Sequence, residues 1–505
     1  MSFRRVGQLV AIVPLIVLWM ACGQVYRPVV LPCSEGGLPG CPVEAPPAPA
    51  NFLAVFGISL NVPNYPGGAM QIDVGGDSII GETPSSDRSA PNLGDNPTHA
   101  AILPNDSTVF VTSAGSTLPG GVDLVSSFSP AFQSSTATGL GSVSTTPLPP
   151  GSLPVFVNTT EAGFVYVANF GTNSVSAINT TSNAVTNTAT VGTNPVALAE
   201  IPDGLKLYVA NQASNSVSSL NTVDMSPNIV TGFAGVTPVW LVARSDSQKV
   251  YVLTQGDGQL VTIDTATDTV TSSLPVGAGA NFISYDPDLN RLYVTNPATS
   301  MVFVFSVSGG INDTPLQLAA IPFTSGSAPC PSACLPTSVT PLPDGSRFYV
   351  ASYRVAASCP DAFIGASSAC LIPSLAVFDA NNFTLKTTLT LLTNPPFSSN
   401  LNTNQYQYAV PPVAACASAA LYSPTTVRFR VFTAAAVDSS RVYVSMCDAG
   451  AIAVVDTTDN DANNPGGPIP ADTVITDLPA AFSAGAIQAN GEPPNQNPIF
   501  LVVGQ

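Results

Sequence analysis

The 505-residue chain is poor in charge, and above all in positive charge and histidine. Only 9% of its residues are charged, Lys and Arg number 14 against 31 Asp and Glu, and His99 is the single histidine. The formal net charge of −17 repels phosphate backbones, so we expect no nucleic acid partner. The chain also lacks a glycine-rich phosphate loop with a lysine, a His-Glu metal motif and a cysteine nucleophile paired with a base. We therefore predict no cofactor and no enzymatic activity.

Long hydrophobic runs are missing too, apart from one near the N-terminus. Basic residues precede an uncharged run from Leu9 to Ala21, which is too short for an ordinary transmembrane span and is typical of a secretory signal. Its end, Leu18–Gly23, resembles a bacterial lipoprotein signal, although Trp19 stands where Leu is commonest. The resemblance implies that residues 1–21 are removed and that Cys22 is lipidated. The alternative is an ordinary cleaved signal and a freely secreted protein.

The predicted location is the cell envelope. A lipidated Cys22 would anchor the chain at a membrane without a spanning helix. By analogy with enterobacterial sorting, Gly23 favours the outer membrane. Residues 22–50 contain scattered prolines and end in the alternating Pro and Ala of Ala45–Ala50, which predicts a stalk, either a semi-rigid spacer or a disordered leader. We assign residues 51–505 to the folded domain.

The nine cysteines become eight if Cys22 is lipidated, and an even number in an exported chain favours disulfides over redox chemistry. A zinc site is not expected, because no second closely spaced pair completes a set of four ligands. Nearest-neighbour pairing is our prediction among many connectivities. The predicted pairs are Cys33–Cys41, Cys330–Cys334, Cys359–Cys370 and Cys416–Cys447.

One short unit recurs along the chain. An apolar strand with a central tyrosine is found around Tyr166, Tyr208, Tyr251 and Tyr293, at spacings of 42, 43 and 42 residues. Several short strands repeating with a period in the low forties predict the blades of a β-propeller. The fold class is therefore all-β.

Each repeat is expected to supply four strands. The first is an apolar inner strand, the second is the Tyr-Val strand, the third alternates and the fourth is Thr-rich. Blades pack face to face, so the central strands should be apolar on both sides, as in Leu207–Ala210. Asn169, Asn211 and Asn296 follow such strands, and we interpret them as turn residues that take left-handed backbone angles and bond their own turns.

The number of blades depends on the chain ends. Second strands are predicted around Phe110, Tyr166, Tyr208, Tyr251, Tyr293, Tyr349 and Tyr443, which makes seven. Phe52–Leu60 and Ala69–Val74 form an incomplete set at one end, and Phe482–Gln488 with Ile499–Val503 form a second at the other. The ring would have eight blades if these ends share one blade, or seven if they are additions.

A family resemblance rests on the tyrosine strands. Tyr293–Asn296 spells the YVTN signature of the YVTN-repeat β-propeller proteins, and Tyr166–Asn169 and Tyr208–Asn211 are close variants. The resemblance is strongest over residues 153–305 and implies a propeller fold, often in exported surface proteins. It implies no single activity.

The best metal candidate is an acidic turn. Asp456, Asp459, Asp461 and Asn463 could supply oxygen ligands to Ca²⁺, but the spacing lacks the glycine and glutamate of a calcium-binding loop. The preferred interpretation is an ordinary turn between two strands.

The leading functional hypothesis is a non-enzymatic, lipid-anchored scaffold that binds a protein or glycan partner at the cell envelope. It rests on a repeat scaffold with an export signal and no reactive residue set. We expect the binding residues where the period breaks, near 353–375 and 394–426, because insertions in repeat proteins lie in surface loops. One alternative is a calcium-dependent propeller hydrolase or lactonase, which needs carboxylates from several inner strands at the channel. The other is a structural protein that assembles with copies of itself.

Overall fold

The structure is a computed structural model of the chain, which divides into two units, residues 1–42 and 43–505. The residues that it describes all belong to the second unit. They are 54–60, 67–82, 93–117, 119–130, 140, 143–160, 163–307, 314–330, 332–359, 368–391, 409–410, 412–417, 428–458, 470–479 and 497–504. The predicted signal, the stalk, Cys22 and the Cys33–Cys41 pair lie outside them. In these ranges no helix has the length and apolar character needed to span a membrane.

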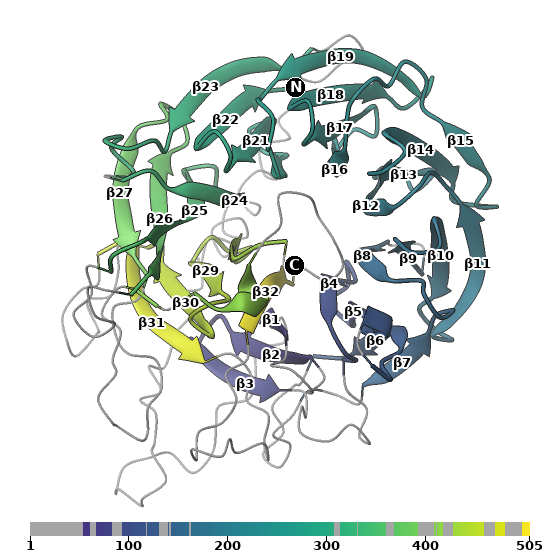
Figure 1. Cartoon of the computed structure of the whole chain (residues 1–505), viewed down its shortest axis with the longest axis horizontal. Coiled ribbons are helices and arrows are strands. Elements are labelled where there is room, and N and C mark those ends of the chain that lie inside the picture. Colours follow the sequence, from purple (N-terminus) through teal and green to yellow (C-terminus); the bar gives the residue numbers. More distant parts are fainter. Residues whose placement is uncertain are drawn as a thin grey trace, which may run out of the picture. The chain divides into compact units, whose positions relative to one another are not determined.

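The second unit is a ring of eight four-stranded antiparallel sheets, so the chain is a β-propeller (Figure 1). Blade 1 consists of β32 (Asn497–Val503), β1 (Ala54–Leu60), β2 (Gly68–Asp73) and β3 (Ser78–Glu82). Blade 2 consists of β4 (Pro97–Ile102), β5 (Val109–Ala114), β6 (Asp123–Phe128) and β7 (Ser144–Pro147). Blade 3 consists of β8 (Pro154–Thr159), β9 (Phe164–Asn169), β10 (Ser174–Asn179) and β11 (Ala184–Thr190). Blade 4 consists of β12 (Pro195–Glu200), β13 (Lys206–Asn211), β14 (Ser216–Asn221) and β15 (Pro227–Ile229).

The remaining blades follow in chain order. Blade 5 consists of β16 (Pro238–Ala243), β17 (Lys249–Thr254), β18 (Gln259–Asp264) and β19 (Thr269–Pro275). Blade 6 consists of β20 (Phe282–Asp286), β21 (Arg291–Asn296), β22 (Met301–Ser306) and β23 (Leu316–Pro322). Blade 7 consists of β24 (Leu335–Pro341), β25 (Arg347–Ala356), β26 (Cys370–Asp379) and β27 (Leu385–Thr390). Blade 8 consists of β28 (Val431–Ala435), β29 (Arg441–Met446), β30 (Ala451–Asp456) and β31 (Thr473–Pro479). Two short 3-10 turns, η1 (Gly115–Thr117) and η2 (Ala414–Cys416), lie in connections.

The strand order in each blade matches the predicted sequence of strand types. Second strands such as β13 are buried along almost their whole length, and Tyr166, Tyr208 and Tyr251 are almost completely inaccessible to solvent. Fourth strands such as β27 alternate between half-buried and exposed residues. The contrast follows from position, since the middle of a blade is covered by neighbouring blades on both faces while the outer strand borders solvent.

The ring closes through a blade shared by the two chain ends, so the eight-blade alternative holds and seven is too few. β32 pairs with β1, for example Val502 with Phe56, and β1 pairs with β2. Ile499–Val503 therefore forms the first strand of blade 1 and not a second strand, which corrects that expectation. Residues 482–488 lie outside the described ranges. Closure leaves no open sheet edge between the first and last blades.

The strand-end asparagines are buried and have strand conformation, so the expected left-handed backbone is wrong for them. The side-chain amide of Asn211 donates to Ser218 Oγ at 3.0 Å, and that of Asn169 donates to Ser176 Oγ at 2.8 Å. The left-handed positions lie a few residues later, at Asn173 (φ 54°) and Asn215 (φ 49°). Asn169 and Asn211 thus bond the following strand, whereas Asn296 accepts a hydrogen bond of 3.1 Å from the Thr299 backbone in its own turn, as predicted.

Ion pairs join neighbouring blades at one face of the ring. Lys206, the first residue of β13, contacts Asp268 of blade 5 at 3.0 Å, and Tyr208 Oη donates to the same carboxylate at 2.5 Å. Arg347 and Tyr349 contact Asp472 of blade 8 in the same way. Both aspartates precede a fourth strand and have positive φ. We call such a cation, tyrosine and aspartate set an inter-blade clasp.

Candidate binding face and central channel

The antiparallel strands give the ring two distinct faces. Face A carries the connections between first and second strands and between third and fourth strands, and therefore the clasps. Face B carries the connections between second and third strands and the segments that lead from one blade to the next. The described disulfides all lie on face B and in one sector of the ring. They are Cys330–Cys334, between blades 6 and 7, Cys359–Cys370, at the end of the β25–β26 hairpin, and Cys416–Cys447, between the segment before blade 8 and the β29–β30 turn.

These three pairings agree with the nearest-neighbour prediction. Cys359–Cys370 closes a hairpin whose strands are longer than elsewhere in the ring, since β25 and β26 have 10 residues each. The extension does not stand alone, because Leu371 and Val410 exchange backbone hydrogen bonds of 2.7 and 2.9 Å. Residue 410 belongs to the long connection between blades 7 and 8. The two places where the repeat period breaks are therefore in contact.

A buried ion pair fixes the base of this region. The Arg430 guanidinium donates to both oxygens of Asp448 at 2.7 and 2.9 Å, and its Cζ lies 5.5 Å from the centre of the Tyr353 ring. Asp448 also accepts a hydrogen bond from the backbone of Val413 at 2.7 Å. Burial disfavours the charged form of Arg430, but the hydrogen bonds that it donates to Asp448 outweigh this effect and raise the pKa of the arginine. The Arg430–Asp448 pair thus links the blade 8 turn, the inserted segment and the hairpin.

Aromatic rings occupy the central channel at its face B end. In six of the eight first strands the channel position carries a ring, and the other two carry Ala197 and Ser338. The rings belong to His99, Phe156, Trp240, Phe282, Phe432 and Phe500. Phe429, just before β28, packs in their midst, with its ring centre 5.7 Å from that of Trp240 and 4.9 Å from that of Phe432. Arg428 lies over Trp240 at 4.8 Å and donates to the Val239 carbonyl at 3.1 Å.

His99 is a packing residue in this cluster. Its ring stacks on Phe156 with centres 3.9 Å apart, and its Nδ1 accepts a long hydrogen bond of 3.4 Å from the Val157 backbone. Burial, and then the charge of Arg428, lower the pKa of His99 to about 3. The imidazole is therefore neutral at physiological pH and makes a poor proton acceptor there.

Carboxylates are not gathered at the channel in the described first strands. Glu200 and Asp286 end β12 and β20 at face A, one in each strand. Burial and then the charge of Asp203 raise the pKa of Glu200 to about 7, and burial raises that of Asp286. Across the part of the chain that the structure describes, no group of three or more His, Cys, Asp or Glu could hold a metal ion.

The predicted calcium ligands are only partly described. Asp456 ends β30 and is buried, where it accepts hydrogen bonds from the Thr458 backbone at 2.9 Å and pairs with Arg441 at 3.0 Å. Asp459, Asp461 and Asn463 lie outside the described residues. The described carboxylate thus pairs within blade 8 with Arg441, the arginine that also contacts Asp77 of blade 1.

Sequence reasoning did not identify the channel cluster or the role of Arg430. A signal exists for the cluster, because Phe156 and Trp240 each follow a proline by two residues at the start of a first strand. Arg430 carries no comparable pattern, and only the fold brings it against Asp448.

No protein-family model matches the chain, and no curated protein matches it in sequence. Several solved structures are similar to it. A periplasmic gluconolactonase of Pseudomonas aeruginosa is 14% identical over 67% of this chain and 95% of its own, with a TM-score of 0.48. A hydrazine synthase of Kuenenia stuttgartiensis is 13% identical over 79% of this chain and 90% of its own, with a TM-score of 0.43. Similarity at this level concerns the propeller fold and carries no argument about activity.

Proposed function

We propose that the chain is an exported, lipid-anchored β-propeller that binds a protein or glycan at the cell envelope without catalysing a reaction. The observation that carries the proposal is the set of crosslinks among the described residues of the extended hairpin and of the segment before blade 8, on face B. Disulfides and the buried Arg430–Asp448 pair restrain the described ends of these segments. Loops fixed in advance bind a partner with less loss of conformational entropy.

The filling of the channel supports a binding role over a hydrolytic one. A propeller hydrolase that uses Ca²⁺ needs oxygen ligands from several first strands at the channel. Here the channel positions of the described first strands carry aromatic rings, Ala197 and Ser338. The five apolar rings offer neither metal ligands nor a general base, and the sixth, His99, is buried against Phe156 with its pKa lowered to about 3.

Two exposed valines give a matched test of the binding face. Val355, on the extended hairpin at face B, is 53% exposed, and Val223, on face A of blade 4, is 86% exposed. The full-length protein and the variants Val355→Glu and Val223→Glu are compared on a glycan array and by crosslinking to envelope proteins. We expect Val355→Glu to lose a partner that Val223→Glu retains. Partners retained equally by both variants would contradict the proposed face.

A second experiment separates binding from catalysis. The full-length protein is incubated with gluconolactone, with and without Ca²⁺ and a chelator. We expect the uncatalysed rate in every sample. Hydrolysis that exceeds this rate and disappears on chelation would overturn the proposal in favour of a calcium-dependent lactonase.

A further inference from the structure

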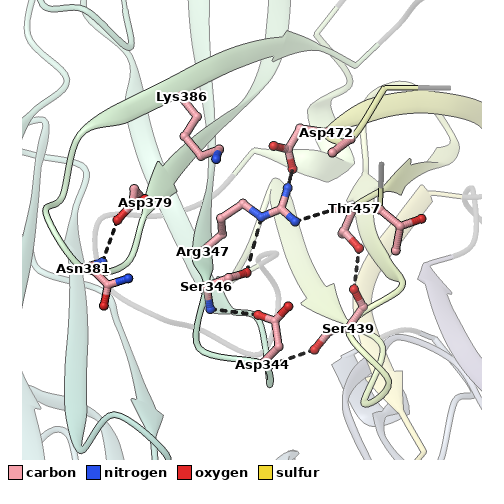
Figure 2. A pocket seen from close by; sticks show the side chains of 11 residues that line it. Asp344, Ser346, Arg347, Asp379, Asn381, Lys386, Ser439, Thr457 and Asp472 are labelled. Carbon is pink, nitrogen blue, oxygen red and sulfur yellow. Dashed lines mark hydrogen bonds and ion pairs between the residues drawn. The ribbon is translucent and has the colours of Figure 1, made fainter. Parts of the chain in front are cut away.

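A polar cavity of about 680 Å³ lies on face A between blades 7 and 8 (Figure 2). Its walls come from the β24–β25 turn with Asp344, the β26–β27 turn with Asp379, Lys386 of β27, and the Arg347–Asp472 clasp. The volume falls in the range of about 300–1,000 Å³ that small-molecule sites occupy. The cavity is on the face opposite the proposed binding face.

The repeat provides an internal reference for this cavity at the interface of blades 4 and 5. Lys206 and Asp268 there form the clasp that Arg347 and Asp472 form here. The turns also match, because the Asp203 N–H donates to Ser247 Oγ at 2.8 Å and the Asp344 N–H donates to Ser439 Oγ at 2.9 Å. The two interfaces thus share one framework, and differences between them are due to side chains.

The position of Lys386 shows the difference most clearly. Counted from the turn before the fourth strand, Asn228 holds the corresponding place in blade 4, because Leu220 pairs with Pro227 as Phe378 pairs with Leu385. β27 then bulges at Lys386, which has no paired counterpart in blade 4. The Asn228 amide reaches across the interface and donates to Asp268 at 3.0 Å. Lys386 makes no hydrogen bond or ion pair to any described residue.

Two further replacements make the cavity more polar. Ser346 stands where blade 4 has Leu205, and Asn381 stands where it has Val223. Both replacements put hydrogen-bonding groups on the wall in place of aliphatic side chains.

Some charged groups of the cavity wall have hydrogen-bond partners in the protein, and others do not. The Arg347 guanidinium is engaged by Asp472 and the Thr457 carbonyl, each at 2.6 Å. Asp344 and Asp379 each use one oxygen to accept backbone hydrogen bonds from their own turn, one of 2.8 Å at Asp344 and two of 2.8 and 3.2 Å at Asp379. Their second oxygens have no partner among the described residues.

We propose that this cavity binds a basic amino acid. The wall offers two carboxylate oxygens and one ammonium group, and the charges that complement them are two ammonium groups and one carboxylate. A molecule with only one kind of charge would leave part of the wall unpaired, which costs affinity. In this arrangement Lys386 pairs with the ligand carboxylate, and Asp344 and Asp379 pair with its two ammonium groups.

The test uses three probes of similar length with the full-length protein. L-lysine carries all three charges, cadaverine lacks the carboxylate and 6-aminohexanoate lacks the α-ammonium. We expect L-lysine to bind most tightly by calorimetry, and Lys386→Asn to weaken L-lysine binding about tenfold. The same variant should not weaken the binding of cadaverine, because Lys386 repels its ammonium groups. Asp203→Asn, the blade 4 counterpart of Asp344, should change nothing.

Three outcomes would overturn the proposal: no saturable binding of L-lysine up to about 10 mM, equal binding of all three probes, or L-lysine binding that Lys386→Asn leaves intact. Lys386 is exposed and unpaired, so its replacement should not disturb folding, which circular dichroism checks. The result is independent of the face B partner, because neither Lys386 nor Asp203 contributes to that face.

Discussion

The ion pair that closes the ring should matter more for local opening than any other clasp. Arg441, the first residue of β29 in blade 8, donates to both oxygens of Asp77 in blade 1 at 2.8 Å each. A second contact of 3.0 Å joins the guanidinium to Asp456. Blades 8 and 1 are joined covalently only through β32, which is the first strand of blade 1. Arg441→Met keeps the aliphatic bulk of the side chain and removes the charge that both carboxylates share.

The free energy lost in Arg441→Met follows from the burial of the ion pair. The side chains of Arg441 and Asp77 are 8% and 18% exposed. Removing one partner of a buried ion pair costs about 3–5 kcal/mol, and the partial exposure of Asp77 favours the lower end, ~3 kcal/mol. Unfolding entropy of ~2.1 cal/mol/K per residue makes this a fall in Tm of about 3 °C for a domain of this size. In an opening confined to the closing blade, the same free energy is about a 100-fold increase in the open population.

Hydrogen exchange measured by mass spectrometry distinguishes local opening of the closing blade from a loss of stability of the whole domain. Arg441→Met should speed exchange in β1, β2 and β29, while blades 3 to 6 keep their protection. Arg347→Met is the matched control, because it removes the Arg347–Asp472 clasp between two blades that are consecutive in the chain. It should lower Tm by a similar amount without exposing blade 1. If both variants leave β1 and β2 equally protected, the closing blade does not open separately and the reasoning fails.

Two further predictions concern pH and disulfides. The pKa of Glu200 is raised to about 7, and one of its buried oxygens has no described partner. The fold therefore favours the protonated carboxyl. The stability of the folded state should fall as pH rises from about 4.5 to 7. Glu200→Gln should therefore raise Tm at pH 8 but not at pH 4, and equal effects at both values would contradict a titration of Glu200. Chain entropy predicts a loss of about 3–4 kcal/mol when Cys416 and Cys447, 31 residues apart, are both replaced by serine, against about 2 kcal/mol for Cys330 and Cys334, 4 apart. Denaturant titrations of the two double variants measure the difference, and a larger loss for the shorter loop would count against the entropic account.

Much of the fold could be predicted because its signals are local. The strand around Tyr208 is short, apolar and repeated, so its period, its burial and its place in a blade follow from the sequence alone. Cys359 and Cys370 could be paired because an antiparallel hairpin brings its two ends together. Disulfides between neighbours in one loop or on one face are the case in which sequence proximity is a good guide.

The channel cluster and the clasps could not be predicted from the sequence, and the reason is physical. Lys206 and Asp268 are 62 residues apart and meet only because consecutive blades place a second-strand start beside a fourth-strand turn. The rings of Phe156 and Trp240 are ordinary inward residues of their own strands, and only the closed ring directs them to one axis. Phe429 follows a long break in the period, where no repeat indicates the position of a residue.

The scarcity of basic residues has a different meaning once their positions are known. Most of the described lysines and arginines are used inside the fold: Lys206, Arg347 and Arg441 hold blades together and Arg430 holds the face B loops. Among the described residues only Arg354 and Lys386 lack a hydrogen bond or ion pair, so the charge presented to solvent is largely acidic. A surface of this kind slows the approach of anionic partners and speeds that of cationic ones, through fields that salt screens. A basic protein partner of face B should therefore bind with an association rate that falls as ionic strength rises, whereas a neutral glycan should bind at a rate that salt does not change.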